Sequence, residues 1–160
     1  NFFCFISSHA YWLFKSEPDC FGISDLKRKK KATWDGVRNY QARNYLRDEV
    51  QLGDVVVFYH SSCAEPAAVG IAKIVRAAYA DKTAWDSHSE HPDPKSTPKN
   101  PIWYVVDVAH VHTFQHPVLL KVLHAMPEMN GSPLTQRGNR LSILPLSEKQ
   151  YRAIEKEGGR

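Results

Sequence analysis

The sequence is short of three things: cysteine, long apolar runs and the motifs of common nucleophilic enzymes. Its 160 residues include only Cys4, Cys20 and Cys63, and no C-x-x-C occurs. An odd, widely spaced set disfavours both a disulfide framework and a cysteine zinc site, so we predict free thiols in a reducing compartment. No apolar run approaches the roughly 20 residues of a membrane-spanning helix. We therefore expect a cytoplasmic protein, or a nuclear one in a eukaryote, with no membrane partner.

Enzyme and metal motifs are equally scarce. His60 is followed by Ser61 and Cys63, but no G-x-S-x-G elbow occurs, and adjacency in sequence does not place side chains in contact. The polar stretch 86–101 contains possible metal ligands whose spacing matches no established motif. These are His88, Glu90, His91 and Asp93. We predict no metal and no cofactor, and a long solvated loop at 86–101.

The basic residues are unevenly distributed. Lys plus Arg number 21 against 17 Asp plus Glu, a net charge of +4 that permits an anionic partner without requiring one. Five consecutive basic residues occupy 27–31, and Arg38, Arg43 and Arg47 follow. We interpret the 27–31 block mainly as a solvated loop; a nuclear-import signal is the alternative in a eukaryote.

The first ten residues differ from the rest of the chain. They lack a basic segment, and the apolar part, Phe2 to Ile6, is too short for a signal-peptide core. We predict that residues 1–10 are a non-native or disordered extension, with a docked N-terminal arm as the alternative. Residues 11–157 then form one domain with a substantial core.

The most informative stretch is 33–47, which predicts a turn followed by a helix. Asp35-Gly36 favours turn geometry, and Asn39 is a plausible N-cap. Apolar residues then recur with helical spacing at Ala42, Tyr45, Leu46 and Val50. Trp34, Arg38 and Asn39 meet at the helix start, an arrangement that suits a planar ligand near a phosphate. A core tryptophan, a surface arginine and an ordinary cap explain the same pattern, and from this stretch alone we favour that interpretation, because such local patterns are common.

Alternating and continuous apolar patterns predict the other elements. Lys15 and Leu13 should lie on one face of the first strand, opposite Trp12 and Phe14. Gly70 inside a strand suggests a bulge or a close approach. The predicted strands are 11–15, 55–59, 67–75, 103–114 and 140–144. In the strand 103–114, every second residue from Tyr104 to Phe114 should lie on the same face. The predicted helices are 23–29 capped by Ser24, and a terminal helix that opens with a Ser147–Gln150 capping box and ends at 158–159; 117–124 is either strand or helix. The class is α+β.

Six blocks of this sequence, in order, resemble the EVE domain family. They are W-L-F-K-S-E-P (12–18), W-D-G-V-R-N-Y-Q-A-R (34–43), F-Y-H-S-S-C (58–63), V-G-I-A (69–72), D-P-K-S (93–96) and R-L-S-I (140–143). The resemblance implies a PUA-like mixed β pseudo-barrel of five to six strands with flanking short helices, related to the YTH readers of methylated adenosine in RNA. It also implies a nucleic-acid-binding module that flips a modified base, a modified cytosine or a related base, into an aromatic-walled pocket. We predict that the protein is a monomer.

The resemblance, combined with physical roles, assigns candidate site residues. Trp34 and Tyr59 would stack on the base, and Asn39, Ser61 and Glu17 would read its edge. Trp12 and His60 belong to the same blocks, although Trp12 fits a core role equally well. The candidates for phosphate or backbone contact are Lys15, Ser16, Arg38, Arg43, Arg47 and Arg140.

A second interpretation is an enzyme that acts on a modified nucleoside. It rests on a weaker resemblance to ASCH-type amidohydrolases of the PUA-like superfamily, with Lys15, Ser16 and Glu17 as the catalytic candidates. Because no nucleophile–base–orienter set is evident, we favour a non-catalytic reader. Whether the partner is DNA or RNA stays open.

Overall fold

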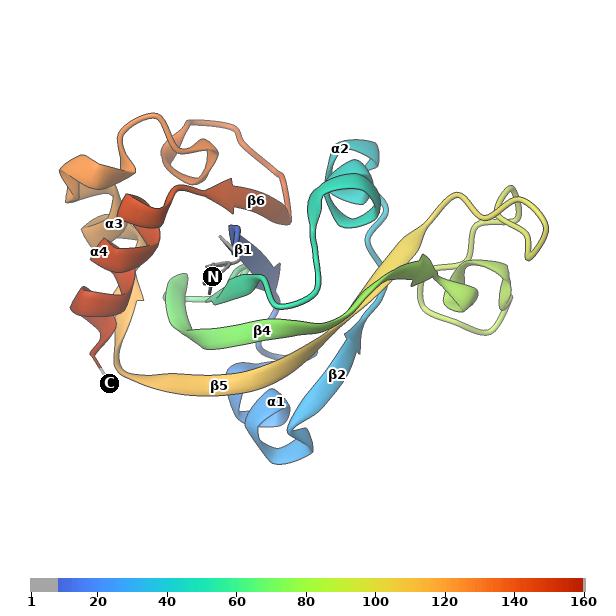
Figure 1. Cartoon of the computed structure of the whole chain (residues 1–160), viewed down its shortest axis with the longest axis horizontal. Helices are drawn as coiled ribbons and strands as arrows, with labels where there is room; N and C mark the ends of the chain where they lie inside the picture. Colours follow the sequence, from blue (N-terminus) through green and yellow to red (C-terminus); the bar gives the residue numbers. More distant parts are fainter. Residues whose placement is uncertain (1–8, 160) are drawn as a thin grey trace, which may run out of the picture.

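The computed structural model describes residues 9–159, and its core is one six-stranded sheet that curls into a pseudo-barrel (Figure 1). The strand order is β2-β5-β4-β3-β1-β6, with β1 and β3 parallel and all other neighbours antiparallel. The strands are β1 (Tyr11–Ser16), β2 (Lys31–Trp34), β3 (Val55–His60), β4 (Ala67–Ala80), β5 (Tyr104–Leu119) and β6 (Ile143–Leu146). The predicted α+β class and strand number are confirmed.

Short helices cover the ends of this sheet. They are α1 (Ile23–Lys29), α2 (Tyr40–Asn44), which continues as a π-helical turn (Tyr45–Glu49), α3 (Leu120–Ala125) and α4 (Glu148–Gly158). In Figure 1, α3 and α4 lie at one end of the long β4–β5 ribbon and the 86–101 loop at the other, with α1 and β2 below the ribbon. Within residues 9–159, no helix is long and apolar enough to cross a membrane.

Two apolar cores lie on opposite faces of the sheet. Trp12 and Phe14 pack in one core and Leu13 in the other, as the alternation along β1 predicts. Ala42 and Leu46 are fully buried in the first core, which confirms the helical stripe of the 33–47 stretch. Buried Asp54 stabilises the same core, because its carboxylate accepts hydrogen bonds from Trp12 Nε1 (2.9 Å), Gln51 N (2.9 Å) and Ala10 N (3.1 Å).

Two irregularities alter the faces of the long strands. Gly70 pairs with Phe58, but Ala68 pairs with Tyr59, so the register shifts beside Gly70 as predicted. A Cβ on Gly70 would lie only 2.6 Å from the His112 carbonyl oxygen. The prediction of one shared face from Tyr104 to Phe114 is wrong. Ala72 pairs with His110 and Ile71 pairs with His112, so Val111 is an extra residue that forms a bulge in β5. The bulge reverses which side chains face which side of the sheet. As a result, Val106 and Phe114 lie in different cores.

Two local predictions need correction, and one strand was missed. Helix α1 is capped by Gly22, whose N–H donates to Asp25 Oδ2 (2.8 Å), and not by Ser24. The last strand is β6 rather than 140–144, because Ile143 pairs with Phe14 and later residues continue that ladder. Strand β2 was not predicted from the sequence. The capping box of α4 is confirmed.

The prediction for the N-terminal extension falls mostly outside the described residues, as does the prediction of a free thiol at Cys4. Cys20 and Cys63 are free, as predicted.

Candidate nucleic-acid interface

A cavity of about 800 Å³ opens between the end of β1 and strand β2. Strand β2 lies at the edge of the sheet, and all four of its residues line the cavity. An edge strand leaves backbone N–H and C=O groups unpaired on its outer side, and such groups can bind a ligand edge. The lining is Lys15, Ser16, Glu17, Cys20, Phe21, Lys29, Lys31, Ala32, Thr33, Trp34, Asp35, Gly36, Glu90, His91 and Asp107.

Trp34 forms part of the cavity wall and part of the core. Its ring lies 5.3 Å from Phe14 and 5.4 Å from Phe58, centroid to centroid, and 6.5 Å from Phe21. Only 8% of Trp34 is exposed. Phe21 also lines the cavity and is half-buried, so two aromatic rings and Ala32 form the apolar part of the wall.

Polar side chains face the same cavity from β1 and from the 35–36 turn. Burial lowers the pKa of Lys15. Burial, followed by the nearby Asp81 carboxylate, raises the pKa of Asp35. Ser16 donates its hydroxyl hydrogen to the Phe21 carbonyl, which ties the end of β1 to the 20–21 segment. The cavity therefore offers ammonium and carboxyl groups, with Glu17 as a further acceptor, to a planar ligand that has both donors and acceptors.

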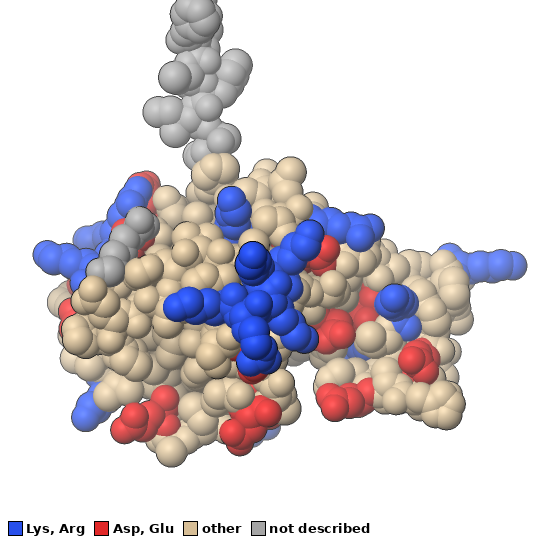
Figure 2. Space-filling model, turned by 90° about the horizontal axis from the view of Figure 1, so that it is seen from below, with Lys and Arg blue, Asp and Glu red and all other residues tan. Residues whose placement is uncertain are grey.

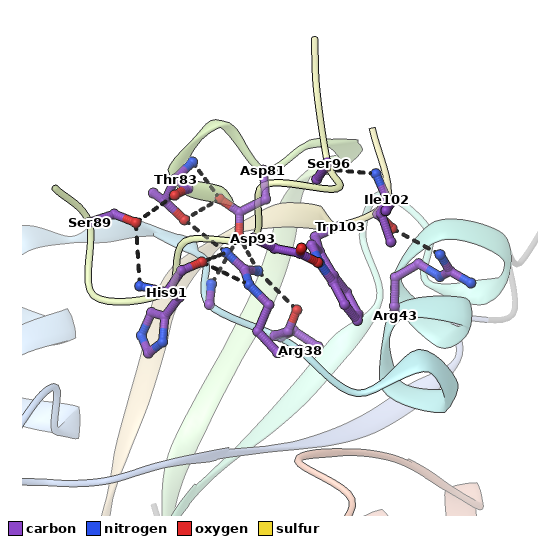
Figure 3. A network of polar contacts seen from close by, with 12 residues as sticks. Arg38, Arg43, Asp81, Thr83, Ser89, His91, Asp93, Ser96, Ile102 and Trp103 are labelled. Atoms are coloured by element: carbon purple, nitrogen blue, oxygen red, sulfur yellow. Dashed lines mark hydrogen bonds and ion pairs between the residues drawn. The ribbon is translucent and has the colours of Figure 1, made fainter. Parts of the chain in front are cut away.

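Arg38 is the centre of a network of polar contacts that positions two lining residues, Gly36 and His91 (Figure 3). Its Nη1 lies 2.8 Å from Asp81 Oδ2, and its Nη2 and Nε donate to the His91 carbonyl at 2.7 and 3.0 Å. Asp81 also accepts from Gly36 N (3.0 Å) and Thr83 Oγ1 (2.6 Å). Arg38 thus connects the turn after β2 to the 86–101 loop, and the buried Asp81 carboxylate binds both Arg38 and the turn.

The His91 ring packs directly on this turn. Gly36 has φ +77°, and a Cβ there would lie 2.7 Å from His91 Cδ2, so glycine is needed for both conformation and space. Farther along the loop, Trp103 Nε1 donates to Asp93 Oδ2 (2.7 Å) and Ile102 N donates to the buried Ser96 Oγ (2.9 Å). The loop is therefore anchored by internal hydrogen bonds, although most of its residues are exposed as predicted.

The structure brings together four of the residues predicted for the site: Lys15, Ser16, Glu17 and Trp34. The other base-contact candidates lie outside the cavity lining. Exposed Asn39 caps α2 as predicted, since its Oδ1 accepts from Ala42 N (3.0 Å). His60 Nε2 accepts from Ile23 N (3.1 Å), and burial lowers the pKa of His60.

Tyr59, Ser61 and Trp12 also lie outside the lining. Tyr59 is 2% exposed, and burial raises its pKa to about 12. Ser61 follows β3 and is half-buried, and its N–H donates to the Ser16 carbonyl (2.9 Å). Trp12 is buried against Tyr45, which supports the core role left open above.

The predicted phosphate contacts have partners of different kinds. Arg43 donates to the Ile102 carbonyl (2.9 Å), and its guanidinium carbon lies 4.9 Å from the centroid of the Tyr40 ring. Exposed Arg47 pairs with Asp48 at 2.8 Å. Arg140 is exposed just before β6.

Several lining residues were not anticipated from the sequence. Asp35 was read only as a turn residue, and Phe21 lies in a segment without periodicity. His91 comes from a loop whose position depends on Arg38, 53 residues away. Of these three, only Asp35 adjoins Trp34 in the sequence, and sequence alone does not say that it lines the cavity.

No group of three or more possible metal ligands occurs in the part of the chain that the structure describes. Of the loop residues considered above, Asp93 binds Trp103 Nε1 and Lys95 N through its two carboxylate oxygens.

Comparisons with known proteins identify the family. A family model described as "EVE domain" matches residues 10–157. Human thymocyte nuclear protein 1 is 40% identical over 166 residues, covering 92% of this chain and 73% of that protein. A crystal structure from Pseudomonas syringae is 50% identical, with a TM-score of 0.88 and coverage of 91% of this chain and 97% of that chain.

A structure of human THYN1 with 5-methylcytosine-containing DNA is 38% identical, with a TM-score of 0.84 and coverage of 94% of this chain and 98% of that chain. An ASCH protein from Zymomonas mobilis, 7% identical with a TM-score of 0.54, shares the fold alone. The match over residues 10–157 and these close relatives show that the chain belongs to the EVE domain family.

Proposed function

We propose that this protein binds nucleic acid and holds a modified base, flipped out of its stack, in the cavity beside β2. The observation that carries the proposal is the meeting of Trp34 and Phe21 with Lys15, Glu17 and Asp35 in one cavity. The solved complex of human THYN1 with 5-methylcytosine-containing DNA supports the same class of ligand. A volume of about 800 Å³ lies within the usual range for small-ligand sites.

The energetics assign distinct roles to the lining. Removing a base from its stack costs a few kcal/mol, and contact with aromatic rings returns about 1–3 kcal/mol. Hydrogen bonds to the base edge must supply the rest. Carboxylates are suitable acceptors for the exocyclic amine of cytosine, so Glu17 and Asp35 are the proposed edge readers. Lys15 is the proposed partner of a carbonyl or phosphate oxygen, and exposed Asn39, Arg47 and Arg140 remain candidates for contacts farther along the strand.

The proposal is for a non-catalytic reader of DNA or RNA that acts as a monomer in the cytoplasm, or in the nucleus in a eukaryote. A second candidate, an enzyme on a modified nucleoside, is favoured by one observation: Lys15, whose pKa is lowered by burial, lines the same cavity as Glu17. An amine with a lowered pKa can act as a base or nucleophile. Product analysis distinguishes the two candidates.

The test compares two duplexes that differ only in one 5-methylcytosine, with binding measured by fluorescence anisotropy. We expect the parent protein to prefer the methylated duplex, and Glu17→Gln and Asp35→Asn to reduce that preference. Glu65→Gln, an exposed carboxylate outside the cavity, is the matched control. Nucleosides recovered from the same samples should be unchanged. Equal affinity for both duplexes would contradict 5-methylcytosine as the ligand, and an altered nucleoside would favour the enzyme.

A further inference from the structure

The basic block 27–31 forms a continuous exposed surface. Lys27, Arg28 and Lys29 form the last turn of α1, Lys30 caps it, and Lys31 begins β2. All five are exposed. Figure 2, which views the molecule from the side where α1 and β2 lie in Figure 1, shows Lys and Arg side chains gathered at the centre of this face. The block is therefore the end of a helix and the start of a strand, not the solvated loop that the sequence suggested.

This positive charge is almost unneutralised. Arg28 pairs with Asp25 at 2.9 Å. Among residues 9–159, no carboxylate lies within ion-pair distance of Lys27, Lys29, Lys30 or Lys31. Concentrated, unpaired positive charge raises the local concentration of anions and accelerates their association.

The sheet extends the surface onto β4. Lys31 and Lys73 both face Ala109, so the three residues share one row on the outer face of β2, β5 and β4. In the next row on this face Arg76 pairs with Asp107, which pairs in turn with Thr33, and the Arg76 guanidinium carbon lies 3.6 Å from the centroid of the Tyr79 ring. The positive residues of this face thus lie on β2 and β4, with Ala109 and Asp107 of β5 between them.

This surface is continuous with the cavity. Lys29 and Lys31 line the cavity and belong to the basic block, and Lys29 Nζ lies 5.6 Å from the centroid of the Phe21 ring. A polymer that places one base in the cavity would therefore have its neighbouring phosphates beside these lysines.

Lys30 occupies a position where the backbone favours another residue. Its φ is +71°, in the region that glycine adopts without strain and that a side chain disfavours. Replacement by glycine would relieve this strain and remove one positive charge. Lys30→Gly therefore tests the role of the charge without an expected loss of stability.

We propose that Lys27, Lys30 and Lys73, together with Lys29 and Lys31 at the cavity rim, bind the phosphate backbone of the nucleic acid whose base enters the cavity. This inference rests on the proposed function and adds the surface that supplies most of the sequence-independent affinity. A membrane surface fits less well, because the apolar residues of α1, Ile23 and Leu26, are buried and leave no apolar face to insert.

The experiment uses the variant Lys27→Gln/Lys30→Gly/Lys73→Gln, none of whose residues lines the cavity. The matched control is Lys121→Gln/Lys149→Gln/Lys156→Gln, which removes the same charge from exposed positions on α3 and α4. The affinities for methylated and unmethylated duplexes are measured from about 0.05 to 0.3 M salt.

We expect the first variant to bind both duplexes roughly tenfold or more weakly near 0.1 M salt, with the slope of log affinity against log salt reduced by about 2–3. The preference for the methylated duplex should persist, and Lys30→Gly alone should not lower the melting temperature. The control variant should retain more affinity and a steeper slope.

Equal affinity and slope for the two triple variants would overturn the inference, and the proposed function would stand if the parent still prefers the methylated duplex. If the parent binds neither duplex, both proposals fall. Loss of binding to phosphatidylserine vesicles, with unchanged duplex affinity, would also overturn the inference in favour of a membrane surface.

Discussion

Arg38 and Asp81 form an ion pair across 43 residues of sequence, with Nη1 and Oδ2 2.8 Å apart. The remaining N–H groups of Arg38 donate to Val37 O, Thr83 Oγ1 and His91 O, so all five donors have partners within the chain. A phosphate contact by Arg38, which the sequence predicts from its physical role, would have to replace one of these bonds. The pair connects the turn after Trp34 to the loop that carries His91.

We expect Asp81→Asn to reduce the free energy of unfolding by about 2–4 kcal/mol at pH 7, because it leaves a partly buried guanidinium without its counter-ion. Burial raises the pKa of Asp81, but hydrogen bonds from Thr83, Arg38 and Gly36 outweigh it and hold the pKa below 3.8. A depressed pKa in the folded state means that this stabilisation is present above pH 3.8 and is lost as pH falls through the folded value.

Urea unfolding of the parent and of Asp81→Asn at pH 7 and pH 3 measures this effect. The difference between the two proteins should be large at pH 7 and smaller at pH 3. Asp86→Asn, an exposed carboxylate nearby in the chain, should show a much smaller difference at pH 7. If the difference in free energy of unfolding between the parent and Asp81→Asn is the same at both pH values, the charge of Asp81 is not what stabilises the turn.

Trp34 requires a conservative substitution, because it is both core and cavity wall. Trp34→Ala should lower the free energy of unfolding by about 3–5 kcal/mol, since the ring packs on Phe14 and Phe58. Trp34→Phe should remain folded by circular dichroism. It should reduce the affinities for the methylated and the unmethylated duplex by the same factor, because stacking is insensitive to a small substituent on the base. Parental affinity in folded Trp34→Phe would assign Trp34 to the core alone.

The sequence predicted elements where apolar periodicity was strong. The alternation along β1 and the stripe from Ala42 to Val50 decide which faces are buried, and both agree with the structure. The predictions from sequence failed where pairing between distant strands determines the local structure. Strand β2 begins within a run of lysines and is a strand because it pairs with β5, and the extra residue between His110 and His112 reverses a face that local alternation predicts.

The site was predictable in part for the same reason. Lys15, Ser16 and Glu17 end a recognisable strand, and Trp34 precedes a recognisable turn, so their meeting follows from strand ends that share one side of the barrel. Asp81 and His91 could not be placed, because their positions depend on an ion pair between distant segments.

We expect neither disulfide formation nor metal binding to contribute to the stability of the protein or to its affinity for nucleic acid. Cys20 and Cys63 are unpaired, and burial together with Glu17 raises the pKa of Cys20. A raised pKa reduces the thiolate fraction at neutral pH, so Cys20 should react slowly with thiol reagents. We expect reductant and chelator to leave the melting temperature and duplex affinity unchanged. Stoichiometric metal in freshly purified protein would contradict this and direct attention to residues 88–93.

Lys15 should contribute to binding at the expense of stability. Burial lowers its pKa from the ordinary 10.5, so the folded state disfavours the protonated form. Folding is therefore opposed at all pH values below 10.5, neutral pH included, and the opposition disappears as pH rises above that value. We expect Lys15→Met to raise the melting temperature at pH 7 and to bind duplexes roughly tenfold more weakly, because a charge-assisted hydrogen bond is lost.

The measurement pairs thermal unfolding at pH 7 and pH 10.5 with duplex binding at pH 7. The stability gain of Lys15→Met should shrink at the higher pH, where the parent lysine is already half neutral in the unfolded state and more than half neutral in the folded state. Lys82→Met, an exposed lysine outside the cavity, should change neither property appreciably. If Lys15→Met is more stable but binds like the parent, the ammonium does not contact the ligand, and the edge readers Glu17 and Asp35 must account for the polar contacts of the base. If it is less stable at pH 7, the aliphatic part of Lys15 packs better than methionine can, and burial of the charge is not the dominant effect at this position.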